Sequence, residues 1–198
     1  FWRSNCIRGY MDFFPGYEMV DTVHGIFHSF KFGNAEFFFL DRCMLVMRFP
    51  VMNGKELLVV NTHNSAYDND GKLKGQEMDY LKNFVTTEYE KGNYVVVGGD
   101  WNQNPPSFPQ NHFNQGKENY DQGIIAADFM PEGWVFAFDP ATPTNRSLRT
   151  AYQPGETATD LIDYFLLSPN VEMLNVKTID MQFTYSDHQP VKLDVRLK

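Results

Sequence analysis

The chain has 198 residues, 42% hydrophobic and 21% charged, which is enough to bury one core and too apolar for a disordered protein. Its formal charge of −8 excludes a broad basic face for polyanions, but it is compatible with a cation site, because such sites collect carboxylates. The two cysteines exclude a disulfide framework, and no apolar run is long enough to span a membrane.

The first 40 residues hold far more than their share of the 18 Phe, 10 Tyr and 3 Trp. The drop in aromatic density falls near Leu40 and Asp41. We therefore expect two regions, an aromatic-rich lead segment of uncertain origin over residues 1–40 and a second region over residues 41–198.

The second region opens with a strand, a helix and another strand. Residues 42–49 favour a strand that stops at Pro50, and Asn53-Gly54 predicts a hairpin turn. The apolar run 57–60 is typical of a strand buried on both faces. Helical spacing from Gln76 to Lys91 ends at Gly92, a residue suited to a left-handed cap. The apolar run 94–97 follows, so the order is that of an α/β fold.

The remaining residues predict a long loop and four more strands. Residues 105–123 are rich in Pro, Asn and Gln and indicate a surface loop. Strands are expected at 134–138, at 161–167 and, as a neighbour of the latter, at 171–179. Residues 191–197 alternate apolar and charged side chains, so the last strand should have one wet face.

Polar residues stand at the ends of these apolar strands, or inside one of them, as they do where sites are built in α/β folds. His63 follows the first run, Asp100 and Asn102 follow the second, and Asp163 interrupts a third. Just before the last strand come Asp187 and His188. Because a carboxylate inside an apolar strand is costly unless paired, Asp163 should have a partner.

These residue types suit metal-assisted hydrolysis of a phosphoester. A hard cation such as Mg²⁺ prefers the carboxylate and amide oxygens that Asp100, Asn102 and Asp187 offer. A histidine held by a carboxylate becomes a general base, and His188 with Asp163 has that composition. His63 could hydrogen-bond a phosphate oxygen as negative charge develops.

Each of these groups also has a purely structural interpretation. His63 alone would more often be a structural hydrogen-bond donor at a strand end. Gly98-Gly99-Asp100 is often simply a turn in which the Asp carboxylate bonds to the backbone. Asp163 could instead pair with Arg146 or Arg149.

The aromatic residues near the second run leave two alternatives open. Trp101 and the loop residues Phe108, Phe113 and Tyr120 either shape a substrate pocket or pack into the core.

The order of the motifs resembles the endonuclease/exonuclease/phosphatase superfamily, which includes deoxyribonuclease-like nucleases, apurinic endonucleases, sphingomyelinases and inositol phosphatases. The resemblance covers about residues 42–198 and rests on Asn61-Thr62-His63, Gly98-Gly99-Asp100-Trp101-Asn102, Ile162-Asp163-Tyr164 and Ser186-Asp187-His188. It implies a four-layer α/β/β/α sandwich of the deoxyribonuclease-like type, with Mg²⁺ or Mn²⁺ as cofactor.

The resemblance also implies a role for each matching residue. His63 would contact the scissile phosphate, while Asp100 and Asn102 would orient the nucleophile, stabilise the transition state and help to bind the metal. Asp163 would hold the catalytic His188. Asp187 would be a metal ligand.

One expected element of this family is missing. Members begin with a strand ending in Asn and a strand carrying a Gln-Glu pair whose Glu is the main metal ligand. Before Arg42 the only glutamates are Glu18 and Glu36, and neither has that context. Residues 24–41 instead resemble a strand pair of PhoD-type phosphatases. We therefore expect the N-terminal half of the sandwich to be lacking and the metal to bind weakly.

The sequence thus predicts a metal-dependent phosphoester hydrolase acting on a small-molecule, lipid-linked or nucleic-acid phosphoester. The alternative is a catalytically impaired remnant of the fold that serves as a binding or assembly module. In either case an apolar sheet face should need cover from residues 1–40, from the missing half or from a second chain. No compartment is predicted.

Overall fold

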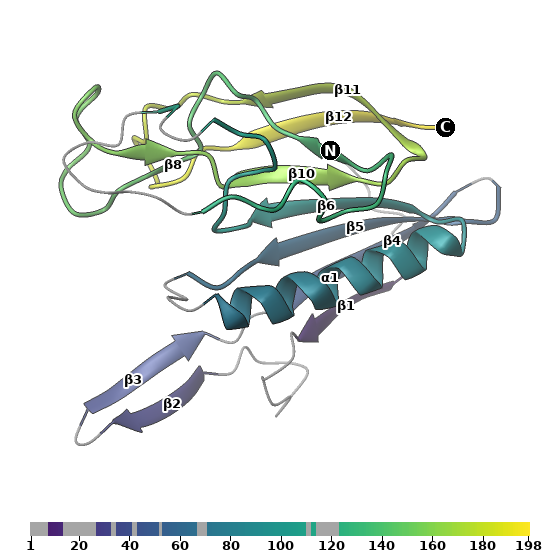
Figure 1. The fold of residues 1–198 in the computed structure, drawn as a ribbon, viewed down its shortest axis with the longest axis horizontal. Helices are drawn as coiled ribbons and strands as arrows, with labels where there is room; N and C mark the ends of the chain where they lie inside the picture. Colours follow the sequence, from purple (N-terminus) through teal and green to yellow (C-terminus); the bar gives the residue numbers. More distant parts are fainter. Residues whose placement is uncertain are drawn as a thin grey trace.

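The computed structural model describes residues 8–13, 27–32, 35–40, 43–51, 53–66, 71–109, 112–113 and 123–198. Figure 1 shows a mixed arrangement of strands and a helix, and α1 is the one helix among these described residues. The elements are β1 (Arg8–Phe13), β2 (Phe27–Phe32), β3 (Ala35–Leu40), β4 (Cys43–Pro50), β5 (Glu56–His63), α1 (Lys72–Glu90), β6 (Tyr94–Asp100), β7 (Val135–Ala137), β8 (Asn145–Arg146), β9 (Thr159–Asp160), β10 (Asp163–Leu167), β11 (Val171–Thr178) and β12 (Val191–Leu197).

The main sheet has six strands in the order β1-β4-β5-β6-β10-β7. β4 and β5 form the predicted antiparallel hairpin, and β5 and β6 are parallel because α1 connects them as a crossover. β1, which belongs to the lead segment, pairs with β4 at the sheet edge. The strand pair expected within residues 24–41 is present as the separate β2-β3 hairpin. The predicted α/β class is therefore confirmed.

One face of the sheet packs against α1. Leu58 and Val60 of β5 and Val95 and Val97 of β6 are almost completely buried there, together with Leu81 of the helix. These side chains recur at every second strand position, which places them all on the same face. Within the part of the chain that the structure describes, no helix is both long and apolar enough to span a lipid bilayer.

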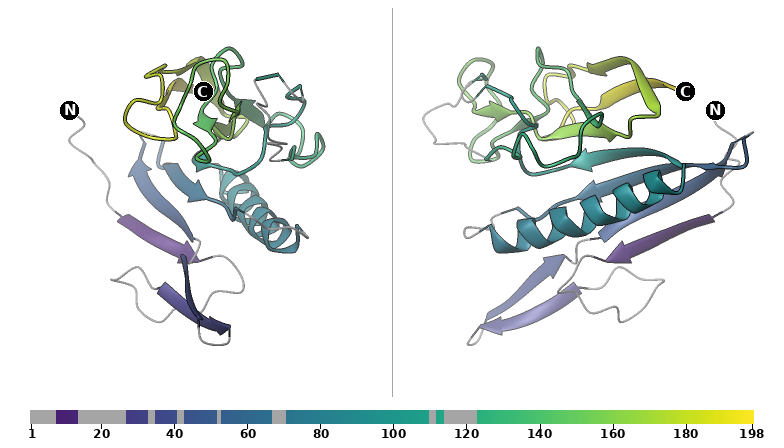
Figure 2. Two further views of the ribbon diagram at one scale, coloured as in Figure 1. Left: turned by 90° about the vertical axis from the view of Figure 1, so that its left-hand side faces the viewer. Right: turned by 45° about the vertical axis from the view of Figure 1, so that its right-hand side comes forward.

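The opposite face is covered only in part. β11 and β12 form a two-stranded antiparallel sheet that packs over β6 and β10 through Leu193 and Val195 (Figure 2). Farther along the sheet, Leu45 is 42% and Val59 37% exposed. The prediction that residues 57–60 are buried on both faces is therefore wrong, because α1 covers one face and the small sheet does not reach Val59.

Two element boundaries and one strand pairing also differ from the sequence prediction. The helix begins at Lys72 rather than Gln76, because left-handed Gly71 starts the first turn and accepts a hydrogen bond from the amide of Gly75. Gly92 has the predicted positive φ, 86°, just after the helix. β10 begins only at Asp163, and β11 pairs with β12 rather than with β10.

A buried polar network ties the end of α1 to the β4-β5 hairpin. Nη1 of Arg48 lies 2.9 Å from Oε2 of Glu88 and 2.7 Å from Oε2 of Glu56. The Glu88 carboxylate also accepts hydrogen bonds from Lys91 and Asn93. Burial raises the pKa of Glu88, but the bonds from Arg48, Lys91 and Asn93 outweigh it and lower the pKa to about 2. This network lies at the C-terminal end of α1, whereas Ser65 and Asn64 contact Glu77 and Met78 in the N-terminal half of the helix.

Candidate active site

Three of the predicted site residues form one row across the main sheet. His63 of β5 is in register with Asp100 of β6, and Asp100 is in register with Asp163 of β10. Positions in register on neighbouring strands project to the same side of a sheet, so the three side chains converge. Nε2 of His63 lies 3.3 Å from Oδ2 of Asp100. The strand pairing, rather than any loop, therefore brings these residues together.

His188 joins the row from the loop before β12. Its Nδ1 lies 2.8 Å from Oδ2 of Asp163, and its Nε2 lies 3.8 Å from Oδ2 of Asp100 and 3.9 Å from Oδ2 of Asp187. The partner of Asp163 is thus this histidine, whereas the guanidinium of Arg146 donates to the carbonyl of Ser147. The structure brings His63, Asp100, Asp163, Asp187 and His188 into one cluster.

The surroundings of His188 alter its basicity. Burial lowers the pKa of His188, but the hydrogen bond and charge of Asp163 raise it, as do the charges of Asp100 and Asp187. The net result is a pKa above the ordinary value of 6.5. His188 is therefore a stronger base than a free imidazole.

Asp100 uses its two carboxylate oxygens differently. Oδ1 accepts a hydrogen bond of 2.9 Å from the amide of Asn102, which closes the turn that the structural interpretation anticipated. Oδ2 faces His63 and His188. Asn102 has a positive φ of 49° and is buried, and its Nδ2 donates to the carbonyl of Asn64. The Asp100 carboxylate thus closes the turn with one oxygen and faces the two histidines with the other.

Close approach of β5 and β6 requires the glycine before Asp100. A Cβ on Gly99 would lie 1.9 Å from the carbonyl oxygen of Thr62, and the φ of Gly99 is 148°. Because the obstructing atom belongs to the backbone, no side chain can be accommodated there. The glycine lets the two strand ends meet closely enough for His63 to reach Asp100.

Two residues that the sequence did not single out hold Asp163 and His188 in place. Oγ1 of Thr144 accepts hydrogen bonds from the amides of Ile162 and Asp163, at 3.0 Å each. Nδ2 of Asn145 lies 3.0 Å from Nε2 of His188 and also donates to the carbonyl of Asp187. Because the Asp187 carbonyl can only accept, the Asn145 atom that contacts it is the amide nitrogen, which is a donor. The same nitrogen therefore donates to Nε2 of His188, and the proton of the neutral ring is on Nδ1.

Three side chains of the cluster lie close enough together to share a cation. One ligand atom each from Asp100, Asp163 and His188 lie within 4.8 Å of one another among the described residues. Two carboxylates and an imidazole are compatible with a divalent cation such as Mg²⁺ or Mn²⁺. Of the other predicted ligands, Asp187 lies 3.9 Å from His188, and Asn102 is buried and bonded through its amide to Asp100.

The aromatic residues near the site belong mainly to the core. Trp101 is fully buried, stacks on Tyr164 at 5.2 Å and donates from Nε1 to the carbonyl of Tyr164. Burial raises the pKa of Tyr164 well above its ordinary value, and the charges of Asp100 and Asp163 add to this effect. Phe108 is also buried, so both it and Trp101 pack rather than line a pocket. Tyr120 lies outside the described residues.

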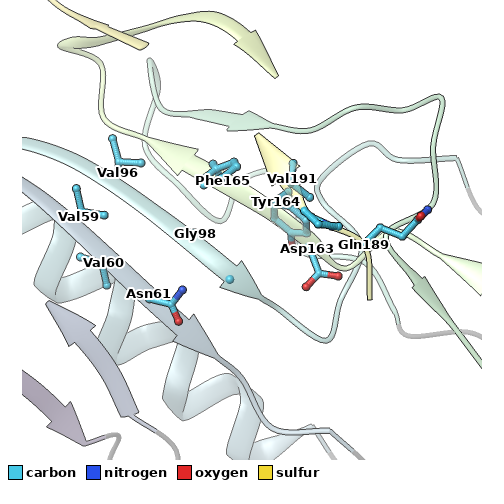
Figure 3. A pocket seen from close by; sticks show the side chains of 12 residues that line it. Val59, Val60, Asn61, Val96, Gly98, Asp163, Tyr164, Phe165, Gln189 and Val191 are labelled. Atoms are coloured by element: carbon cyan, nitrogen blue, oxygen red, sulfur yellow. The ribbon is translucent and has the colours of Figure 1, made fainter. Parts of the chain in front are cut away.

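A pocket of about 330 Å³ opens next to the cluster, between β5, β6 and β10 on one side and the start of β12 on the other. Figure 3 shows Asp163 and Gln189 at one end of this pocket and Val59 and Val96 at the other, with Phe165 between them. The pocket therefore has a polar end beside the site and an apolar end under the open sheet face.

Known structures share this fold. An endonuclease/exonuclease/phosphatase from Bacteroides vulgatus matches with a TM-score of 0.57 and 15% identity over 98% of this chain and 66% of its own length. One from Beutenbergia cavernae matches with a TM-score of 0.53 and 17% identity over 80% and 40%. ANGEL2, described as a 2′,3′-cyclic phosphatase, matches with a TM-score of 0.52 and 16% identity over 96% and 74%.

These likenesses define the class of fold. The chain has the α/β fold of the endonuclease/exonuclease/phosphatase proteins, as its motifs indicated. It spans 40% and 66% of the length of the two bacterial structures. No family model matches the sequence, and no curated protein is significantly similar to it.

Proposed function

We propose that the chain is a metal-dependent phosphoester hydrolase in which His188, held by Asp163, activates water. The observation that carries the proposal is the 2.8 Å contact between Nδ1 of His188 and Oδ2 of Asp163, on a ring whose Nε2 faces Asp100. A histidine oriented by a carboxylate, next to a further carboxylate, is a common arrangement for general-base chemistry.

The proposed role of His188 follows from its tautomer. Nδ1–H donates to Asp163, so the lone pair of the ring lies on Nε2; it accepts from Nδ2 of Asn145 and can take a proton from water where water replaces that amide. Once protonated, the ring is stabilised by the negative charge of Asp163, of Asp100 and of Asp187, which also raise the pKa of His188. The proton taken from water is then held on Nε2 while the new P–O bond forms and the bond to the leaving group breaks, and it passes afterwards to the leaving-group oxygen or to solvent.

His63 is suited to contact the phosphoryl group. Its side chain is 54% exposed, and Oδ2 of Asp100 orients its Nε2 from 3.3 Å. A proton on Nε2 can then be shared between this carboxylate and a phosphate oxygen that gains charge in the transition state. Asp100 would also orient the attacking water. Asn102 holds the Asp100 turn through its backbone amide.

A divalent cation would supply positive charge to the phosphate oxygens and lower the pKa of a bound water. Asp100 and Asp187 are the carboxylates we propose as ligands, with Asn102 as the amide ligand predicted from the sequence. The clustering of Asp100, Asp163 and His188 supports a cation site at this place. Mg²⁺ or Mn²⁺ suits these donors, and binding should be weak with so few ligands.

The substrate should be a phosphoester without an extended polyanionic chain. The net charge of −8 weakens attraction to a nucleic-acid backbone, although it does not oppose a nucleotide. The pocket next to the site has an apolar end, formed by Val59 and Val96, which favours a small or lipid-linked phosphoester. The description of ANGEL2 as a 2′,3′-cyclic phosphatase supports phosphoester chemistry on this fold.

The competing proposal is a binding or assembly module that has lost catalysis. It is supported by residues 1–41, where Glu18 and Glu36 do not stand in a Gln-Glu pair. Under this proposal the open sheet face around Val59 would be the contact surface for further protein.

One experiment separates the two proposals. Hydrolysis of bis-p-nitrophenyl phosphate is measured while Mg²⁺ or Mn²⁺ is titrated, in the wild type, in His188→Ala and in the control His112→Ala. His112 is matched because it contacts Phe108 and the carbonyl of Pro140 rather than the cluster. We expect metal-dependent turnover that His188→Ala abolishes and His112→Ala retains. Turnover that needs no metal, or that His188→Ala leaves unchanged, refutes the proposed metal-dependent mechanism of His188. Wild-type protein that hydrolyses nothing with either metal favours the binding module.

A further inference from the structure

A fully buried carboxylate on α1 has no part in the chemistry described so far. Glu77 is 0% exposed, and its two oxygens accept hydrogen bonds from the amide of Ser65 at 2.8 Å and from Oγ of Ser65 at 2.7 Å. Burying a charged carboxylate is costly unless hydrogen bonds compensate it. Two short bonds to one residue therefore fix the position of Ser65 strongly relative to the helix.

Ser65 lies two residues after His63, and Asn64 between them is held from three sides. The amide of Asn64 donates to the carbonyl of Asp100 at 2.9 Å. Its Oδ1 accepts a 2.7 Å bond from Oγ1 of Thr62, and its Nδ2 lies 3.2 Å from Sδ of Met78. The turn after β5 is therefore fastened to the helix and to the end of β6.

The same turn holds a residue of the site. The carbonyl of Asn64 accepts a 2.8 Å hydrogen bond from Nδ2 of Asn102. Asn102 in turn closes the Asp100 turn through its own amide. A continuous set of hydrogen bonds thus runs from Glu77 through Ser65 and the adjoining Asn64 to the carboxylate that faces both histidines.

We propose that Glu77 is a positioning residue of the active site. It acts through Ser65 and Asn64, sets the place of His63 and of the Asp100 turn, and touches no reacting atom. The catalytic part of this inference rests on the proposed hydrolase function, whereas its geometric part does not. A displacement of about 1 Å at a reacting group can lower turnover about a hundredfold, so this support is expected to matter for rate.

Glu88 offers a control on the same helix. It is a buried glutamate too, with hydrogen bonds to Arg48, Lys91 and Asn93, and it lies in the last turn of α1. If Glu77 only stabilised the fold, Glu77→Leu and Glu88→Gln would have the same kind of effect. The comparison therefore separates positioning from stability.

The experiment uses Glu77→Leu, Glu77→Gln and Glu88→Gln in the 198-residue chain. The first readout is the NMR signal of the Asn102 side-chain amide in metal-free protein. We expect Glu77→Leu to shift this signal, Glu77→Gln to shift it less because one acceptor oxygen remains, and Glu88→Gln to leave it in place. The second readout is hydrolysis, for which we expect Glu77→Leu to lower kcat about tenfold or more with little change in KM.

An unchanged Asn102 signal in folded Glu77→Leu overturns the inference, as does an equal effect of Glu88→Gln on the signal. If Glu77→Leu does not fold, Ser65→Ala, which removes one of the two bonds to Glu77, takes its place and must shift the same signal. If the wild type hydrolyses no phosphoester with any metal, the proposed function fails. The NMR comparison still decides whether Glu77 positions the site.

Discussion

The charge of Glu88 should stabilise the fold in a strongly pH-dependent way. The substitution Glu88→Gln keeps the shape of the side chain but removes the charge that faces Arg48 at 2.9 Å and Lys91 at 2.7 Å. Arg48 is 6% exposed, so it cannot turn to water, although Glu56 at 2.7 Å still neutralises it in part. The variant should therefore fold but be less stable.

The size of the loss follows from the pKa of Glu88. A fall from the ordinary value of 4.5 to about 2 corresponds to about 3 kcal/mol in favour of the folded state. Because the folded pKa is the lower one, this stabilisation is present above pH 4.5 and disappears as the pH falls toward 2. We expect Glu88→Gln to cost about 2 to 3 kcal/mol at pH 7, since Gln keeps one acceptor oxygen.

The assay is urea denaturation of wild type and variant at a series of pH values from 7 to 2.5. We expect the difference in free energy of unfolding to be constant down to about pH 5 and then to shrink steadily. A difference that stays the same at pH 7 and pH 2.5 would refute the reasoning. The loss would then come from packing rather than from charge.

Two further predictions concern the site itself. Asp163→Asn should lower the pKa of His188, because the carboxylate bonded to Nδ1 is the largest of the influences that raise it. NMR titration of metal-free protein measures this, and a His188 pKa equal to that of the wild type would contradict it. Gly99→Ala should cost more than about 3 kcal/mol in thermal denaturation, because its Cβ would meet the Thr62 carbonyl. The control Gly54→Ala has a positive φ but open space and should cost only about 1 kcal/mol, so equal losses would rule out the clash.

Much of the site could be predicted because its residues follow a simple rule of sheets. His63 and Asp100 end two buried apolar runs separated by a helical segment, and parallel strands joined by a helix bring their carboxyl ends to one edge. The cost of a lone carboxylate predicted a partner for Asp163, which the structure places at His188. The catalytic roles of these residues stay predictions.

Other features had no local signal in the sequence. Asn145 lies in a stretch of mixed polar residues without periodicity, and only the contact between residues 145 and 188 gives it a place at the site. The sequence indicates that Glu77 is a surface residue of an amphipathic helix. Only the structure shows that the turn at Ser65 packs against it and buries its carboxylate. The exposure of Val59 was also hidden, because an apolar run does not reveal how many layers will cover it.

The row formed by His63, Asp100 and Asp163 limits where the length of the chain can change. Side chains alternate along a strand, so one residue inserted in β6 before Gly98 would turn the Asp100 carboxylate toward α1 and remove it from both histidines. An insertion between residues 105 and 123 would leave all three positions of the row in place. Length variants of this protein should therefore keep the strands constant and place their insertions in the connections.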